Sequence, residues 1–130
     1  FFFFSSGSGL PAAQFLRVLA DGSQRFYPFA RFDSATNRFV AVPIDLGAAN
    51  EQVFLILFGT GWRGRNLNIP VAASMGSALA EVGFSGAAPG LLGVDQANLR
   101  IPRSLTGAGE IEVQLTVDGK AANPVRINTK

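Results

Sequence analysis

The sequence predicts an all-β protein whose strands form an antiparallel sandwich or barrel. Short apolar runs recur about every ten residues between turn residues, and the chain holds 15 Gly and 7 Pro, a spacing typical of such folds. Helical periodicity is nearly absent, because the one candidate segment, Ala72–Val82, contains Gly76 and lacks capping residues. With 130 residues, 48% of them apolar, the chain is long enough for one domain with one hydrophobic core.

Nine segments are predicted as strands, because each is a short apolar or alternating run that ends at turn residues. They are Gln14–Ala20, Gln24–Phe29, Arg38–Pro43, Gln52–Gly59, Leu67–Ala72, Ala78–Phe84, Gln96–Ile101, Glu110–Val117 and Pro124–Asn128. The pairs Asp21-Gly22 and Asp118-Gly119 predict hairpins, since Asp-Gly tolerates the positive φ that two-residue turns require. Apolar and polar residues alternate along the strand before Asp118, which predicts one buried face and one solvent-exposed face.

The segment Gln52–Gly59 differs from the other strands because it is apolar on both faces. One face carries Val53, Leu55 and Leu57, and the other carries Phe54, Ile56 and Phe58. A strand of this kind is an aggregation hazard if one face stays exposed. Two explanations remain open for the outer face: a loop of the same chain covers it, or a neighbouring subunit does.

The N-terminus carries four consecutive phenylalanines, Phe1–Phe4, followed by the Ser/Gly tether Ser5–Gly9. Burial of one Phe side chain is worth roughly 1.5–3 kcal/mol, so the tetrad favours burial in its own core, a membrane or another molecule. No stretch approaches the ~20 apolar residues of a membrane helix, so no membrane span is expected. The first ten residues reach at most ~35 Å. Residues 1–9 are therefore interpreted as an extension with a flexible tether, and residues 10–130 as the folded domain.

No catalytic chemistry is predicted. His and Cys are both absent, which excludes disulfides, thiol catalysis and imidazole general bases, so the chain is not expected to be an enzyme and no cofactor or metal ion is predicted. Basic residues are scattered singly, and nucleic-acid binding is not expected either. Trp62 beside Arg63 and Arg65 has two interpretations: a surface that contacts a ligand or glycan, or a Trp that closes one end of the core.

The C-terminal half carries the motif Ser85–Pro102, with the run Gly86-Ala87-Ala88-Pro89-Gly90 before Gly93 and Asp95-Gln96, followed by Gly109–Val113 and Val117–Val125. Together with Phe32–Asn37 and Val53–Trp62, these segments resemble the Solibacter-type C-terminal domain, an uncharacterised bacterial family, over residues 17–127. The resemblance implies a secreted, immunoglobulin-like β-sandwich at the cell surface or outside the cell. It implies no activity, cofactor or catalytic residue, and the Phe tetrad is not part of its pattern.

The first functional hypothesis is a structural subunit of an extracellular bacterial filament assembled head-to-tail. The N-terminal Phe segment would add to the neighbouring subunit's sheet as a donor strand, with Ser5–Gly9 as the hinge. The partner is then another copy of the chain, and the interface residues are Phe1, Phe2, Phe3, Phe4, Phe54, Ile56 and Phe58.

Two alternatives belong to other classes. In one, the chain is an extracellular immunoglobulin-like binding or adhesion module whose Trp62, Arg63 and Arg65 contact carbohydrate. In the other, it is a passive stalk domain of a secreted protein, and Phe1–Phe4 folds back onto its own sandwich as an edge strand.

Overall fold

The computed structural model of the protein describes the backbone of residues 2–3 and the whole of residues 10–130. Within these residues the chain forms twelve strands and one short 3-10 turn, η1 (Arg103–Leu105). The strands are β1 (Phe2–Phe3), β2 (Ala13–Val18), β3 (Gln24–Pro28), β4 (Ala30–Asp33), β5 (Arg38–Ala41), β6 (Gln52–Thr60), β7 (Ala72–Met75), β8 (Ala78–Ala87), β9 (Asp95–Arg100), β10 (Gly109–Val117), β11 (Lys120–Ala121) and β12 (Val125–Thr129).

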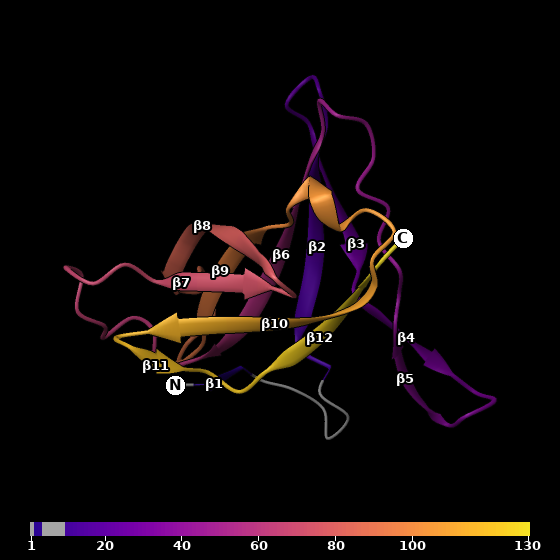
Figure 1. Ribbon diagram of the computed structural model, residues 1–130. Helices are drawn as coiled ribbons and strands as arrows, with labels where there is room; N and C mark the ends of the chain where they lie inside the picture. The colour runs from indigo at the N-terminus through magenta and orange to yellow at the C-terminus, as the bar shows by residue number, and fades with distance from the viewer. Residues whose placement is uncertain (1, 4–9) are drawn as a thin grey trace.

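The strands form two packed antiparallel layers (Figure 1). The first layer has the order β3-β2-β6-β9 and ends on the second half of β8. In the second layer the first half of β8 is followed by β7 and β10, and β11 and β12 both pair with β10. The predicted all-β sandwich is therefore confirmed.

One strand, β8, belongs to both layers. Its residues 78–80 pair with β7, and its residues 81–87 pair with β9. The ladder with β9 is interrupted between Val82 and Phe84, so that Gly83 forms a bulge. Because a bulge bends a strand and increases its twist, β8 can leave one sheet and enter the other.

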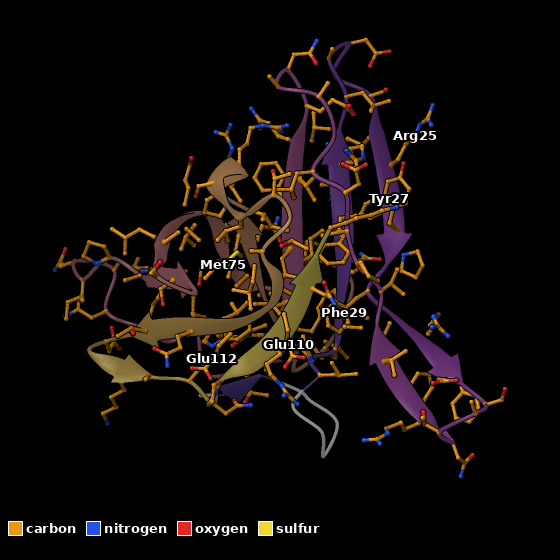
Figure 2. The ribbon with its side chains drawn as sticks, turned by 45° about the vertical axis from the view of Figure 1, so that its right-hand side comes forward. Arg25, Tyr27, Phe29, Met75, Glu110 and Glu112 are labelled. Carbon is orange, nitrogen blue, oxygen red and sulfur yellow. The ribbon has the colours of Figure 1, made fainter. Side chains whose placement is uncertain are left out.

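The hydrophobic core lies between the layers and follows the predicted alternation. On β10, Ile111, Val113, Leu115 and Val117 are all buried. On β6 the buried inner set is Val53, Leu55 and Leu57, as the sequence predicts. Figure 2 labels two further core residues, Met75 on β7 and Phe29 after β3, of which Met75 has no exposed surface.

One predicted strand is wrong and a few short strands were missed. The segment 67–71 is a loop, and β7 begins only at Ala72. The loop is fixed by a turn bond from the Ile69 amide to the Asn66 carbonyl (3.1 Å) and by the Asn66 amide, which donates to the Asp118 carboxylate at 3.0 and 3.1 Å. The missed strands are β4, the two-residue β11 and all of β7 except Ala72, whereas β1 lies in the Phe segment for which an edge strand is one of the alternatives above.

Candidate subunit interface

The two described residues of the Phe tetrad form β1 on the edge of β6. Phe3 lies opposite Gly59 and Phe2 opposite Thr60, whereas β2 begins with Ala13 opposite Leu57. From the pair Phe3–Gly59 to the pair Ala13–Leu57, the residue number changes by two on β6 and by ten on the N-terminal segment. Since β9 occupies the other side of Gly59, β1 and β2 lie end to end along one edge of β6, with an eight-residue shift in register between them.

The outer face of β6 carries the predicted apolar set, but its three members differ in burial. Ile56 is buried, at 4% exposed, while Phe54 and Phe58 are half-buried. Cross-strand neighbours of Ile56 are Gln14 on β2 and Asn98 on β9, and Phe54 lies opposite Leu16 and Arg100. Among the described residues, none of the three belongs to the core cluster between the layers. They therefore form part of a second apolar surface, on the outside of the first layer.

A projecting hairpin supplies aromatic side chains that are not among the predicted interface residues. Strands β4 and β5 form a separate two-stranded sheet that extends away from both layers (Figure 1). Phe32 and Phe39 face each other across this hairpin with ring centroids 5.5 Å apart and an edge-to-face angle of 69°. Both rings are more than half exposed. The sequence feature that indicates this aromatic pair is the position of two Phe residues on either side of the polar turn Asp33-Ser34-Ala35-Thr36-Asn37.

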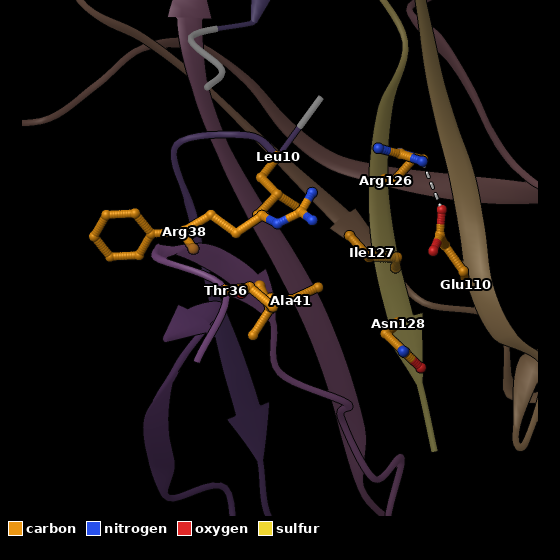
Figure 3. A pocket seen from close by; sticks show the side chains of 10 residues that line it. Leu10, Thr36, Arg38, Ala41, Glu110, Arg126, Ile127 and Asn128 are labelled. Atoms are coloured by element: carbon orange, nitrogen blue, oxygen red, sulfur yellow. Dashed lines mark hydrogen bonds and ion pairs between the residues drawn. The ribbon is translucent and has the colours of Figure 1, made fainter. Parts of the chain in front are cut away.

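A groove separates this hairpin from β12 (Figure 3). It is open to solvent and measures about 370 Å³, with Arg38 and Ala41 of β5 on one wall. The other wall holds the ion pair between Arg126 and Glu110, at 2.8 Å. Its lining is mixed, with charged groups on both walls, so it offers no enclosed site for a small apolar ligand.

The structure contradicts the predicted ligand surface at Trp62. The Trp62 side chain has no exposed area, so no sugar ring can stack on its face; it closes one end of the core instead. Arg63 is half exposed, but its Nε donates to Asp95 Oδ1 at 2.6 Å and its Nη2 donates to the Val94 carbonyl at 2.8 Å. Arg65 is half-buried. The three residues therefore belong to a structural loop rather than a shared binding face.

Asp95 is the anchor of that loop. Its carboxylate accepts hydrogen bonds from the backbone amides of Trp62 at 2.7 Å and Arg63 at 3.2 Å, besides the Arg63 guanidinium. Asp95 is only 2% exposed, and burial alone would raise its pKa. The hydrogen bonds from the Arg63 side chain and from both amides, with the guanidinium charge, outweigh burial and hold the pKa of Asp95 below its usual value of 3.8.

Two arginines fix the loop 45–51 at another part of the sandwich. Arg103 donates to the carbonyls of Leu46 and Glu51, both at 3.1 Å, and to the carbonyl of Gly47. Arg17, which is 8% exposed, donates to the Asp45 carbonyl and lies 3.5 Å from the Glu51 carboxylate. Gly47 has φ +72°, and a Cβ atom there would collide with the Arg17 guanidinium. This cluster is satisfied internally and positions a loop.

The remaining predicted interface residues, Phe1 and Phe4, lie outside the described residues, as does the tether Ser5–Gly9. Within the described residues no group of three or more Asp or Glu side chains is placed to hold a metal ion. No helix in the described part of the chain is long and apolar enough to span a bilayer.

The fold and the surfaces described above define a β-sandwich with an N-terminal edge strand, an apolar outer face and an aromatic hairpin. No family model, no curated protein and no solved structure matches the chain.

Proposed function

We propose that the protein is a structural subunit of an extracellular bacterial filament, in which the N-terminal Phe segment inserts into the neighbouring subunit. The observation that carries the proposal is the position of β1, a two-residue strand on the edge of β6 whose register is shifted by eight residues from that of β2. Backbone pairing is independent of which copy supplies the strand. The same strand of a neighbouring copy can therefore occupy the edge of β6.

Such an exchange propagates because the donor strand and the acceptor edge belong to the same chain. A copy that gives its β1 to a neighbour leaves the end of its own β6 free at Gly59 and Thr60. The contact is head-to-tail, and head-to-tail contacts extend into filaments when the rotation between copies does not close a ring. The nine residues that connect Phe3 to Ala13 span at most about 32 Å, so only a neighbour in direct contact can receive the strand.

A second candidate is the passive stalk domain of a secreted protein, which is favoured by the pairing of β1 with β6 of its own chain. In that arrangement the Phe segment completes its own sheet. The binding-module alternative loses its main support, because Trp62 is fully buried.

Engineered cysteines separate the two candidates, since the natural chain has no Cys. Phe2 and Thr60 are direct cross-strand partners, and directly opposite Cα atoms in antiparallel sheet lie about 4.5–5.5 Å apart, within disulfide range. Purified F2C and T60C single variants are mixed under assembly conditions and oxidised. Strand exchange predicts covalent dimers that contain one of each variant, and the F2C/T60C double variant should give a ladder of oligomers.

The stalk candidate predicts the opposite pattern: an internal disulfide and a monomer band for the double variant, and no mixed dimers. A mixture of F2C with L79C controls for random collisions, because Leu79 is 86% exposed and lies on β8. Electron microscopy of the full chain beside a version without residues 1–9 gives an independent readout. Filaments that disappear with the deletion support the proposal, and monomers from both preparations contradict it.

A further inference from the structure

The outer face of the first layer and the β4–β5 hairpin together form an apolar corner, whose most exposed members are Phe26, Phe32, Phe39 and Phe84. The hairpin acts as a wall and the sheet as a floor. Between them lies an open hollow of about 430 Å³, lined by Gln14, Phe26 and Pro28 of the sheet and by Ala30 and Phe39 of the hairpin. The two surfaces are therefore continuous.

The corner exposes four aromatic rings to solvent. Phe26 is 58% exposed, Phe32 52%, Phe39 57% and Phe84 40%. Together these rings expose about as much surface as two complete Phe side chains, roughly 300–500 Å². That equals the largest apolar patch of an ordinary monomer and supplies about half of the ~800 Å² that each partner buries in a stable interface. The half-buried Phe54 and Phe58 extend the same surface across β6.

The corner also carries no net charge among its described residues. Residues in register with Phe54 and Ile56 across the sheet are Leu16, Gln14, Asn98 and the pair Arg100–Glu81, whose opposite charges lie 3.6 Å apart. The hairpin contributes Phe32 opposite Phe39 on the inner face.

On the hairpin, Arg31, Asp33 and Arg38 precede or follow the facing Phe pair by one residue, so strand alternation places their side chains on the opposite face. Two such neutral surfaces do not repel one another, whereas a strongly charged partner would find few counter-charges here.

From this geometry we infer that the apolar corner is a docking surface for a second copy of the chain, joined face to face about a two-fold axis. A projecting arm beside a hollow is self-complementary, because the hairpin of each copy can place Phe39 in the hollow of the other. A two-fold contact brings the same patch of both copies together. The contact uses residues other than β1 and does not depend on strand exchange; where both occur, it joins subunits or filaments laterally.

Sedimentation equilibrium of the full chain tests this inference. The F32S/F39S double variant removes the aromatic rings of the arm, and F26S independently alters the floor of the hollow. Both should raise the dimer dissociation constant roughly tenfold or more, as truncation of a central aromatic contact does. The matched controls are L79S and L92S, since Leu79 and Leu92 are 86% and 101% exposed and neither lines the hollow. Their dissociation constants should stay within about twofold of the natural chain.

The oxidised F2C/T60C chain separates this contact from the strand contact. If its disulfide is internal, β1 cannot be exchanged, and any dimer that remains and is lost with F32S/F39S supports the corner. If the disulfide joins copies, the width of the filaments is measured instead. Adding F32S/F39S should then reduce this width from that of paired filaments to that of single filaments. The inference is overturned if the sedimentation mass or the filament width of both F32S/F39S and F26S equals that of the natural chain. A natural chain that stays monomeric up to its solubility limit also overturns the inference. The same holds if the monomer binds phosphatidylserine vesicles through the corner instead of a second copy.

Discussion

Replacement of Asp95 by Ala should destabilise the fold through the loop that carries Trp62. The substitution removes the acceptor of two backbone amides and of the Arg63 guanidinium. A buried donor left without a partner costs about 1–3 kcal/mol, and a bond to a charged group contributes about 1.5–3 kcal/mol. Because the Arg63 side chain can turn to water, we expect a total loss of about 2–5 kcal/mol. That is a large part of the ~5–15 kcal/mol that holds a domain folded.

Urea denaturation followed by Trp fluorescence measures this loss, because the chain has one Trp and it is fully buried. With a urea slope of ~2 kcal/mol per molar, in the middle of the typical range, the midpoint of D95A should fall by roughly 1–2.5 M. The D95N variant keeps one acceptor oxygen and should lose less. R65A is the matched control from the same loop and should lose no more than ~0.5 kcal/mol. A midpoint of D95A equal to that of R65A would refute the anchoring role of Asp95.

The same carboxylate predicts a pH dependence. Its pKa in the folded protein lies below the usual value of 3.8, so folding favours the charged form. The stability that this group contributes is fully present above the unfolded pKa and is lost as the pH falls through the folded pKa. The midpoint difference between the natural chain and D95N should therefore be constant near neutral pH and narrow below about pH 4. A difference that widens on acidification would contradict the assigned direction.

Three further predictions concern the core and the loop 45–51. W62A should cost about 3–5 kcal/mol by thermal or urea unfolding, read by circular dichroism, because it empties a buried Trp site. G47A should be destabilised by about 2 kcal/mol or more, since Gly47 has φ +72° and its Cβ would meet Arg17. The control G22A should cost only ~1 kcal/mol, because Gly22 has φ +85° but nothing within 4 Å. R103A should speed amide hydrogen exchange in the loop that contains Gly47, by removing donors to three carbonyls; unchanged exchange would contradict this.

Strands with regular alternation could be predicted from the sequence because their pattern is local. On β10 every second residue from Ile111 to Val117 is buried, and the following turn has positive φ at both Asp118 and Gly119. The double-sided β6 was also predicted, since its two apolar sets follow from the period of a strand. Its outer set lies outside the core cluster between the layers, and the burial of Ile56 depends on neighbours from other strands.

The features that could not be predicted from the sequence depend on contacts between residues far apart in the chain. No local pattern around Asp95 indicates its anchoring role, because its amide partners lie 32 and 33 residues away. The segment 67–71 has strand-like composition, but the bond from Asn66 to Asp118, 52 residues away, holds it as a loop. The exposed rings of the β4–β5 hairpin were missed because a Phe in a short strand is ordinarily a core residue.

The passage of β8 from one layer to the other has a mechanical consequence. In many sandwiches the layers adhere only through side chains, and a shearing load can slide one over the other. Here residues 78–80 are hydrogen-bonded into one layer and residues 81–87 of the same strand into the other. A load applied at β6 reaches β10 through β9, β8 and β7 by backbone bonds alone. Separating the layers therefore requires β8 to be detached from β7 or from β9.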